Sequence, residues 1–194
     1  LLSIKKINGY GVVLHIGKYV GQTREQSIKT IIKNINQVIF DLEFKLKNNT
    51  KLPYIIIENT AGQGTEIGST IEELSEIYNL LDKNPRIKFC VDTAHAFASG
   101  YDIKTENGFN DFIKKFEKLI GIKNIGLFHF NDSKKELGSR VDRHDSIGVG
   151  LIGEEGLKRI AKYAKEKTIP IILETPDKEV SHLEDIKKVK NWFK

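Results

Sequence analysis

Methionine is absent from this sequence of 194 residues, and cysteine occurs only once. Because even the first residue is leucine, we expect the untrimmed product of the reading frame to extend further upstream. The single thiol, Cys90, has no partner for a disulfide and belongs to no Cys-x-x-Cys metal motif. It lies in the apolar run IKFCVD (87–92), which favours a buried side chain that acts as a small hydrophobe.

Long apolar runs are also missing. No stretch approaches the roughly 18 residues that span a bilayer, and the first residues, LLSIKKINGYG, lack the apolar segment of a signal peptide. We therefore expect a soluble, intracellular protein without a membrane partner, located in the cytoplasm or the nucleus, or associated with a virion if its source is a virus.

Charge of neither sign dominates. The 31 Lys and Arg residues exceed the 26 Asp and Glu residues by enough to give a net charge of +5. This modest excess permits a polyanionic partner without requiring one. If several acidic residues bind metal ions inside a cleft, the outer surface is more basic than the total indicates.

Five short runs rich in Ile, Val and Phe predict buried parallel strands, at 12–16, 54–59, 87–92, 125–132 and 170–175. Between and after them, apolar residues at helical spacing predict amphipathic helices, the clearest over 28–42. Capping boxes precede the first two, at Thr23-x-x-Gln26 and Thr70-x-x-Glu73. The βαβαβαβαβα order predicts an α/β fold in one domain, either an open doubly wound sheet or a closed (β/α)8 barrel.

The polar residues decide between these folds. Every predicted strand carries an ionisable side chain at or near its C-terminal end, namely His15, Glu58, Asp92, His129 and Glu174. In a TIM barrel all strand ends converge on one mouth, whereas an open sheet gathers such groups at one switch point. A full barrel has eight strands in typically about 250 residues. We therefore expect residues 1–194 to form a single partial domain, the C-terminal five βα units of a TIM barrel that is monomeric when complete.

Imidazoles and carboxylates are the ligand set that suits zinc or manganese. Asp92 and His95 lie three residues apart where the third strand ends, and an extended loop would point Asp142 and His144 the same way. The sequence thus offers eight candidate metal ligands: His15, Glu58, Asp92, His95, His129, Asp142, His144 and Glu174.

The alternative is that each of these residues is only structural. One buried histidine or glutamate is more often hydrogen bonded than metal bound, but eight that share one mouth would repel or stay undersatisfied without cations. The fifth histidine, His182, follows Ser181 in a Ser-x-x-Glu capping box that ends at Glu184, and we expect it in the exposed first turn of the last helix.

Basic residues crowd the loop that bears Asp142 and His144 and could hold DNA phosphates there, although a merely solvated loop is the alternative. The loop after the second predicted strand is rich in glycine, at Gly62, Gly64 and Gly68, so a ligand could approach its backbone closely. The candidate DNA contacts from both loops are Lys134, Lys135, Arg140, Arg143, Gln63 and Gly64.

Several blocks together resemble the endonuclease IV family of abasic-site endonucleases: LHIGKYVG (14–21), ENTAGQGTEIG (58–68), VDTAHAFASGYDI (91–103), FHFNDSKKELGSRVDRHDSIGVGLIG (128–153) and ILETP (172–176). The resemblance implies a TIM barrel with up to three Zn²⁺ ions, partly Mn²⁺ in some members. Glu58 would bridge the first and second metals, with His15 on the first. Asp92, His129 and Glu174 would hold the second metal, and His95, Asp142 and His144 the third. A further histidine that ligates the first metal in the family has no counterpart in this chain.

The resemblance also implies a reaction. Metals lower the pKa of a bound water and neutralise the phosphate in an in-line displacement. Family members cleave double-stranded DNA 5′ to abasic sites during base excision repair and remove 3′-blocking groups. Glu174 is the candidate that orients or deprotonates the attacking water, and Glu58 is the second catalytic candidate.

Two other interpretations stay open. Sugar isomerases and epimerases of the xylose isomerase-like barrels share this architecture and place Glu, Asp and His around one or two metals. Against them, His95, Asp142 and His144 have no evident task in a sugar isomerase. The chain could also be an inactive or incomplete remnant that needs its N-terminal strands.

Overall fold

A parallel five-stranded sheet forms the centre of the structure, with strand order β1-β2-β3-β4-β7. The computed structural model describes residues 1–6, 8–45, 52–176 and 182–193. The strands are β1 Gly11–His15, β2 Tyr54–Glu58, β3 Ile87–Asp92, β4 Ile125–His129 and β7 Ile171–Ile172. All five predicted strands are present, but the last two are shorter than expected. Residues 132–133 belong instead to a separate antiparallel hairpin of β5 (Asp132–Ser133) and β6 (His144–Asp145).

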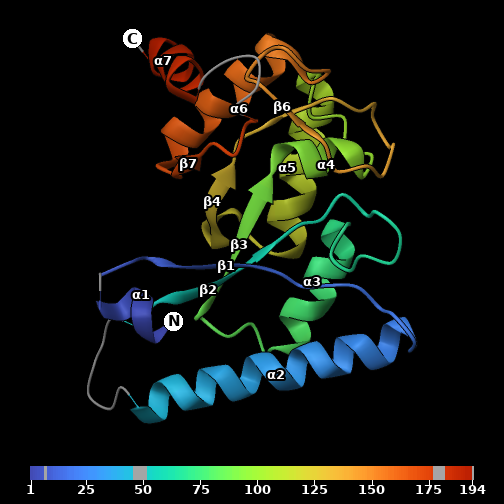
Figure 1. Ribbon diagram of the computed structural model, residues 1–194, viewed down its shortest axis with the longest axis vertical. Helices are drawn as coiled ribbons and strands as arrows, with labels where there is room; N and C mark the ends of the chain where they lie inside the picture. The colour runs from blue at the N-terminus through green and yellow to red at the C-terminus, as the bar shows by residue number, and fades with distance from the viewer. Residues whose placement is uncertain (7, 46–51, 177–181, 194) are drawn as a thin grey trace.

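The helices lie along one face of the sheet. They are α1 Leu2–Lys6, α2 Arg24–Lys45, α3 Ile71–Leu80, α4 Thr93–Ala98, α5 Glu106–Leu119, α6 Gly153–Lys167 and α7 His182–Asn191, with a 3-10 turn at Ile122–Asn124. Figure 1 shows α2, α3, α5 and α6 following one another around the outside of the sheet. A doubly wound sheet would carry helices on both faces. Helices on one face fit a barrel wall.

Burial divides the sheet in the same way. Side chains such as Ile57, Phe89 and Phe128 face the helices and belong to the large apolar core. The opposite face carries a small separate cluster of Ile56, Cys90 and Leu127. Because neighbouring residues of a strand point to opposite faces, each strand serves both clusters. Cys90 is fully buried, as its apolar neighbours predicted.

Capping fixes where the first two predicted helices begin. The backbone N–H of Gln26 donates to Thr23 Oγ1 and the N–H of Thr23 donates to Gln26 Oε1, so the first capping box is complete. Thr70 also caps its helix, but the Glu73 carboxylate accepts from the N–H groups of residues 68 and 69 rather than closing a box. The capping box expected at Ser181 lies outside the described residues.

Candidate metal centre

Parallel register aligns the C-terminal ends of the strands. His15 lies beside Glu58 in the β1–β2 pair, and Asp92 lies beside His129 in the β3–β4 pair. Because these positions follow one another on adjacent strands with their side chains on the inner face, four polar groups meet at one edge of the sheet. Glu174 follows β7 at the same edge.

Glu58 is the centre of this group. Its carboxylate is 1% exposed and receives His15 Nε2 on one oxygen and His129 Nδ1 on the other, both at 2.8 Å. Burial alone would raise the pKa of Glu58, but the hydrogen bonds from His129 and His15 lower it to about 2. Glu58 is therefore a buried carboxylate that stays charged, which suits a bridging ligand.

His129 contacts two carboxylates. Its Nδ1 atom lies 2.8 Å from Glu58 Oε1 and 3.0 Å from Glu174 Oε2. Burial disfavours the charged imidazole, yet the contacts with Cys90, Glu174 and Glu58 raise its pKa. The same hydrogen bond from His129 lowers the pKa of Glu174. Four groups, namely those of Glu58, Asp92, His129 and Glu174, each offer an atom close enough together to share one metal ion.

The short helix α4 brings His95 to the same place. Asp92 is its N-cap, and Asp92 Oδ1 accepts from the His95 N–H at 2.8 Å. His95 Nε2 lies 3.3 Å from Asp142 Oδ2. Burial opposes protonation of His95, but Asp92, Asp142 and Glu58 raise its pKa to about 10. The contact with His95 is also the main cause that lowers the pKa of Asp142 to about 2.

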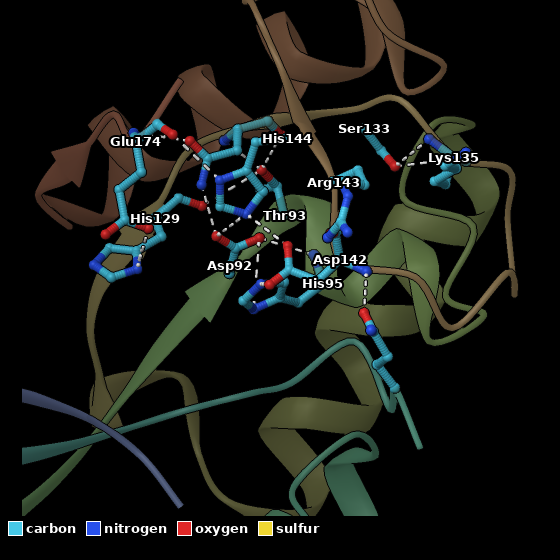
Figure 2. A network of polar contacts seen from close by, with 12 residues as sticks. Asp92, Thr93, His95, His129, Ser133, Lys135, Asp142, Arg143, His144 and Glu174 are labelled. Atoms are coloured by element: carbon cyan, nitrogen blue, oxygen red, sulfur yellow. Dashed lines mark hydrogen bonds and ion pairs between the residues drawn. The ribbon is translucent and has the colours of Figure 1, made fainter. Parts of the chain in front are cut away.

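The hairpin of β5 and β6 supplies the remaining pair. His144 Nε2 lies 3.4 Å from Asp142 Oδ1 and 3.5 Å from Asp92 Oδ2, so the two residues predicted to point the same way do lie together. Figure 2 shows these side chains converging with His95 on Asp92, while Glu174 and His129 approach from the other side. All eight candidate ligands therefore belong to one connected cluster.

Two histidines carry nitrogen atoms that lack a hydrogen-bond partner. Nδ1 of His95 donates to the carbonyl oxygen of Asn59 at 2.9 Å, and Nδ1 of His144 donates to that of Glu174 at 3.2 Å. The opposite atoms, both Nε2, are buried and make no hydrogen bond within the described part of the chain, although carboxylate oxygens of Asp142 and Asp92 lie 3.3 to 3.5 Å from them. A backbone carbonyl that fixes one ring nitrogen while the other stays open is the arrangement of metal-binding histidines. The residues present thus fit a metal centre.

The grouping of ligands differs from the expected one at His95. The expected second set, Glu58, Asp92, His129 and Glu174, is found as one group. His95, however, approaches both Asp92 with His144 and Glu58 with His15. Its short helix places it between the two positions, because Asp92 holds the start of α4 beside the strand ends.

Sequence reasoning missed three buried polar residues around the cluster. Asn59 exchanges hydrogen bonds with the backbone of Asp92, donating to its carbonyl and accepting from its N–H. Asn131 donates to Asp92 Oδ2, and Thr93 Oγ1 donates to the Asn131 carbonyl. Asn59 directly follows β2 and Asn131 lies two residues beyond β4, and these positions were the only signal that the sequence offered.

The candidate DNA contacts divide into two groups. Arg143 is exposed beside Asp142, and Gln63 Oε1 accepts from the Asp142 backbone N–H at 3.2 Å, so both border the cluster. Lys134 Nζ lies 3.8 Å from Asp145 Oδ1, in the hairpin of β5 and β6. Figure 2 shows Lys135 set apart, beside Ser133. Arg140, whose φ is 53°, and Gly64 are both exposed.

Several known proteins are similar to this chain in sequence and in fold. A family model described as a xylose isomerase-like TIM barrel matches residues 4–194. The chain belongs to this family. Within this TIM-barrel family, a protein of Acanthamoeba polyphaga mimivirus whose assigned name is endonuclease 4 is 39% identical over 194 residues, which are 95% of this chain and 61% of that protein. An apurinic-apyrimidinic endonuclease 1 of Plasmodium falciparum is 40% identical and is covered over 30% of its length, while all of this chain is covered.

Solved structures have a similar fold. The crystal structure of endonuclease IV from Thermus thermophilus superposes with a TM-score of 0.78 at 28% identity, covering 98% of this chain and 64% of that one. A D-tagatose 3-epimerase-like protein has a TM-score of 0.67 at 17% identity, which is evidence for the fold alone. The expected resemblance to endonuclease IV and the TIM-barrel fold are confirmed. The chain spans about three-fifths of the length of the curated relatives that it matches.

Proposed function

We propose that the protein is a zinc-dependent endonuclease that hydrolyses the phosphodiester 5′ to abasic sites in double-stranded DNA and cleans blocked 3′ ends. Residues 1–194 would be five units of a single (β/α)8 domain that acts as a monomer, inside the cell. The observation that carries the proposal is the cluster of eight imidazole and carboxylate groups, in which the buried Nε2 atoms of His95 and His144 face the carboxylates of Asp142 and Asp92 without a hydrogen bond. Relatives named as endonucleases at 39 to 40% identity support the choice of reaction.

Zinc, or manganese at some positions, would bind in two groups that share the Glu58 carboxylate and in a third group that holds His95, Asp142 and His144. When bound, such ions lower the pKa of a water molecule and neutralise a phosphate. Glu58 stays ionised because His129 and His15 donate to it, so it can join two neighbouring sites without a proton to lose.

Glu174 is the candidate to orient the attacking water. Its side chain is 43% exposed, far more than the buried Glu58, so it can reach both solvent and the cluster. One of its oxygens lies 3.0 Å from His129 Nδ1, and its lowered pKa keeps it an acceptor. A positioned carboxylate of this kind can take a hydrogen bond from water at the reacting phosphate.

Phosphate binding would fall to the basic side chains at the rim. Arg143 lies next to Asp142, and Lys134 belongs to the same hairpin. Their positive charges would hold the DNA backbone beside the metals without reading sequence. Gln63, which borders the cluster, stays a candidate for a DNA contact, and Lys135, Arg140 and Gly64 stay candidates for more peripheral contacts.

A sugar isomerase is the less favoured alternative. It would use the group of Glu58, Asp92, His129 and Glu174, but it gives no task to the contacts that join His95, Asp142 and His144. Those contacts form a further group of ligands next to the first, which suits a phosphodiester with its several oxygens better than one sugar.

The test is a nicking assay on the full chain loaded with zinc. The substrate is a duplex with one tetrahydrofuran abasic-site analogue, and the matched variants are Glu174→Gln inside the cluster and Glu184→Gln on the exposed face of α7. We expect one nick 5′ to the lesion, lost with Glu174→Gln or a chelator and retained with Glu184→Gln. A zinc-loaded chain that does not nick refutes activity of this chain alone, and the same assay on a chain extended to the length of its relatives then tests the reaction itself.

A further inference from the structure

A fully buried asparagine connects two of the candidate ligands. Asn131 is 0% exposed, and it lies two residues beyond β4. Its Nδ2 atom donates to Asp92 Oδ2 at 2.7 Å, and its Oδ1 atom accepts from the backbone N–H of Glu174 at 2.8 Å. One side chain thus spans from the end of β3 to the segment that follows β7.

The backbone of Asn131 is held as firmly as its side chain. Its N–H donates to Thr93 Oγ1 at 2.9 Å, and its carbonyl accepts from the same hydroxyl at 2.6 Å. Thr93 is itself buried at the first position of α4. The amide group of Asn131 therefore has little freedom to turn.

The segment carrying Glu174 depends on this contact more than other strand ends do. The strand β7 has only two residues, paired with Phe128 and His129 of β4. The N–H of Phe130 still donates to the Ile172 carbonyl, but the next backbone donor, the N–H of Glu174, goes to the Asn131 side chain. The Asn131 side chain thus accepts the backbone hydrogen bond at the point where the pairing of β4 with β7 ends.

We propose that Asn131 is a positioning residue that sets the Asp92 carboxylate and the Glu174 segment relative to each other for metal binding. Only an amide supplies both a donor for a carboxylate and an acceptor for a backbone N–H in that volume. An aspartate would place a second carboxylate 2.7 Å from Asp92, and an apolar residue would leave both partners unpaired. Asn59 exchanges hydrogen bonds with the backbone of Asp92, whereas Asn131 donates to the Asp92 carboxylate.

This inference rests on the proposed metal centre, so its test measures metal binding and folding separately. The full chain is compared with Asn131→Ala and with Asn124→Ala. Asn124 is also buried, 7% exposed, and donates to the Ile120 carbonyl at 2.7 Å, but it precedes β4 at the end remote from the cluster. Zinc affinity is measured by competition with a chromophoric chelator, and thermal unfolding is recorded in EDTA.

We expect Asn131→Ala to weaken zinc binding by about 10- to 100-fold, the usual effect of removing a group that orients a metal ligand. Asn124→Ala should lower the midpoint of thermal unfolding in EDTA by about as much as Asn131→Ala does, because each variant loses a buried hydrogen bond. Asn124→Ala should leave the zinc affinity within about twofold of the wild-type value. Cobalt loaded in place of zinc should show a changed visible absorption spectrum only with the Asn131 variant.

Equal zinc affinity in the wild type and in Asn131→Ala overturns the proposal while the metal centre stands. A wild-type chain that binds no zinc overturns the metal centre and this proposal together. If Asn131→Ala does not fold, Asn131→Ser and Asn124→Ser are compared in the same way, since serine keeps a hydroxyl in place of the amide. A loss of affinity with both serine variants alike then refutes the role of Asn131.

Discussion

Loading the metal-free chain with zinc near neutral pH should release about two to three protons from the cluster. In the metal-free protein, the neighbouring carboxylates raise the pKa of His95 to about 10 and also raise that of His129. Both imidazoles are therefore charged, and each must lose its proton to bind a metal ion. The hydrogen bond with Glu58 also raises the pKa of His15, so this histidine adds up to about one further proton. The pKa values of Glu58 and Asp142 are lowered to about 2, so these carboxylates release none.

The proton count appears directly in a calorimetric titration with zinc. The observed heat is compared in two buffers with different ionisation enthalpies, and the slope gives the protons released. Because at least two protons leave, zinc affinity should rise by at least about a hundredfold per pH unit between neutral pH and the pKa of His95. At higher pH the dependence should flatten.

A slope near zero would refute this reasoning, because it would mean that both imidazoles are already neutral in the metal-free chain. The matched control is His182→Gln. His182 lies in the exposed first turn of α7, as predicted, and contacts the Thr175 carbonyl outside the cluster. Its removal should leave the proton count unchanged, whereas His129→Gln should lower it by about one.

Three further predictions concern the fold and the cluster. Asp132→Ala should destabilise the chain by about 3 kcal/mol and weaken zinc binding, because the buried carboxylate accepts from the backbone N–H of Ser133 and from those of Gly150 and Ile152 in the loop between β6 and α6. Urea unfolding and zinc titration measure the two effects. Phe116→Ala should cost about 3 to 5 kcal/mol in urea unfolding without changing zinc affinity, since this fully buried ring packs on Phe89 in the apolar core between the sheet and the helices and contributes no candidate ligand. In EDTA, the ion pairs of Glu58 should stabilise the fold fully above about pH 4.5, and that contribution should be lost as the pH falls toward 2. Glu58→Gln should weaken this acid dependence, and Asp142 and Glu174, whose pKa values are also lowered, should keep the rest.

The sequence predicted strands and helices well because each element follows its own periodicity. The runs around Ile55 to Ile57 and Phe89 to Val91 are apolar on both faces, and the structure buries both faces. The amphipathic helix over 28–42 is present as α2. Val38 has the helical spacing of the buried apolar residues, but it is 40% exposed. That position lies beyond the edge of the stripe that packs on the sheet.

The ends of elements were harder to predict. The run IGLFHFND is apolar enough for one strand over 125–132, yet β4 ends at His129. Beyond that point the chain turns so that Asn131 and Asp132 can bond to other loops. These partners are remote in sequence, so no local pattern could reveal them.

Register explains why strand-end residues were predictable as a cluster while their exact grouping was not. The inner face of each strand alternates with the core face, so a slip of one residue would turn Glu58 toward the helices and Ile57 toward the mouth. The apolar pattern therefore fixes which strand-end side chains face inward. His95 and His144 have no such constraint, because a six-residue helix and a two-residue strand hold them. Their positions follow from hydrogen bonds to Asp92 and to backbone carbonyls, which only the folded chain supplies.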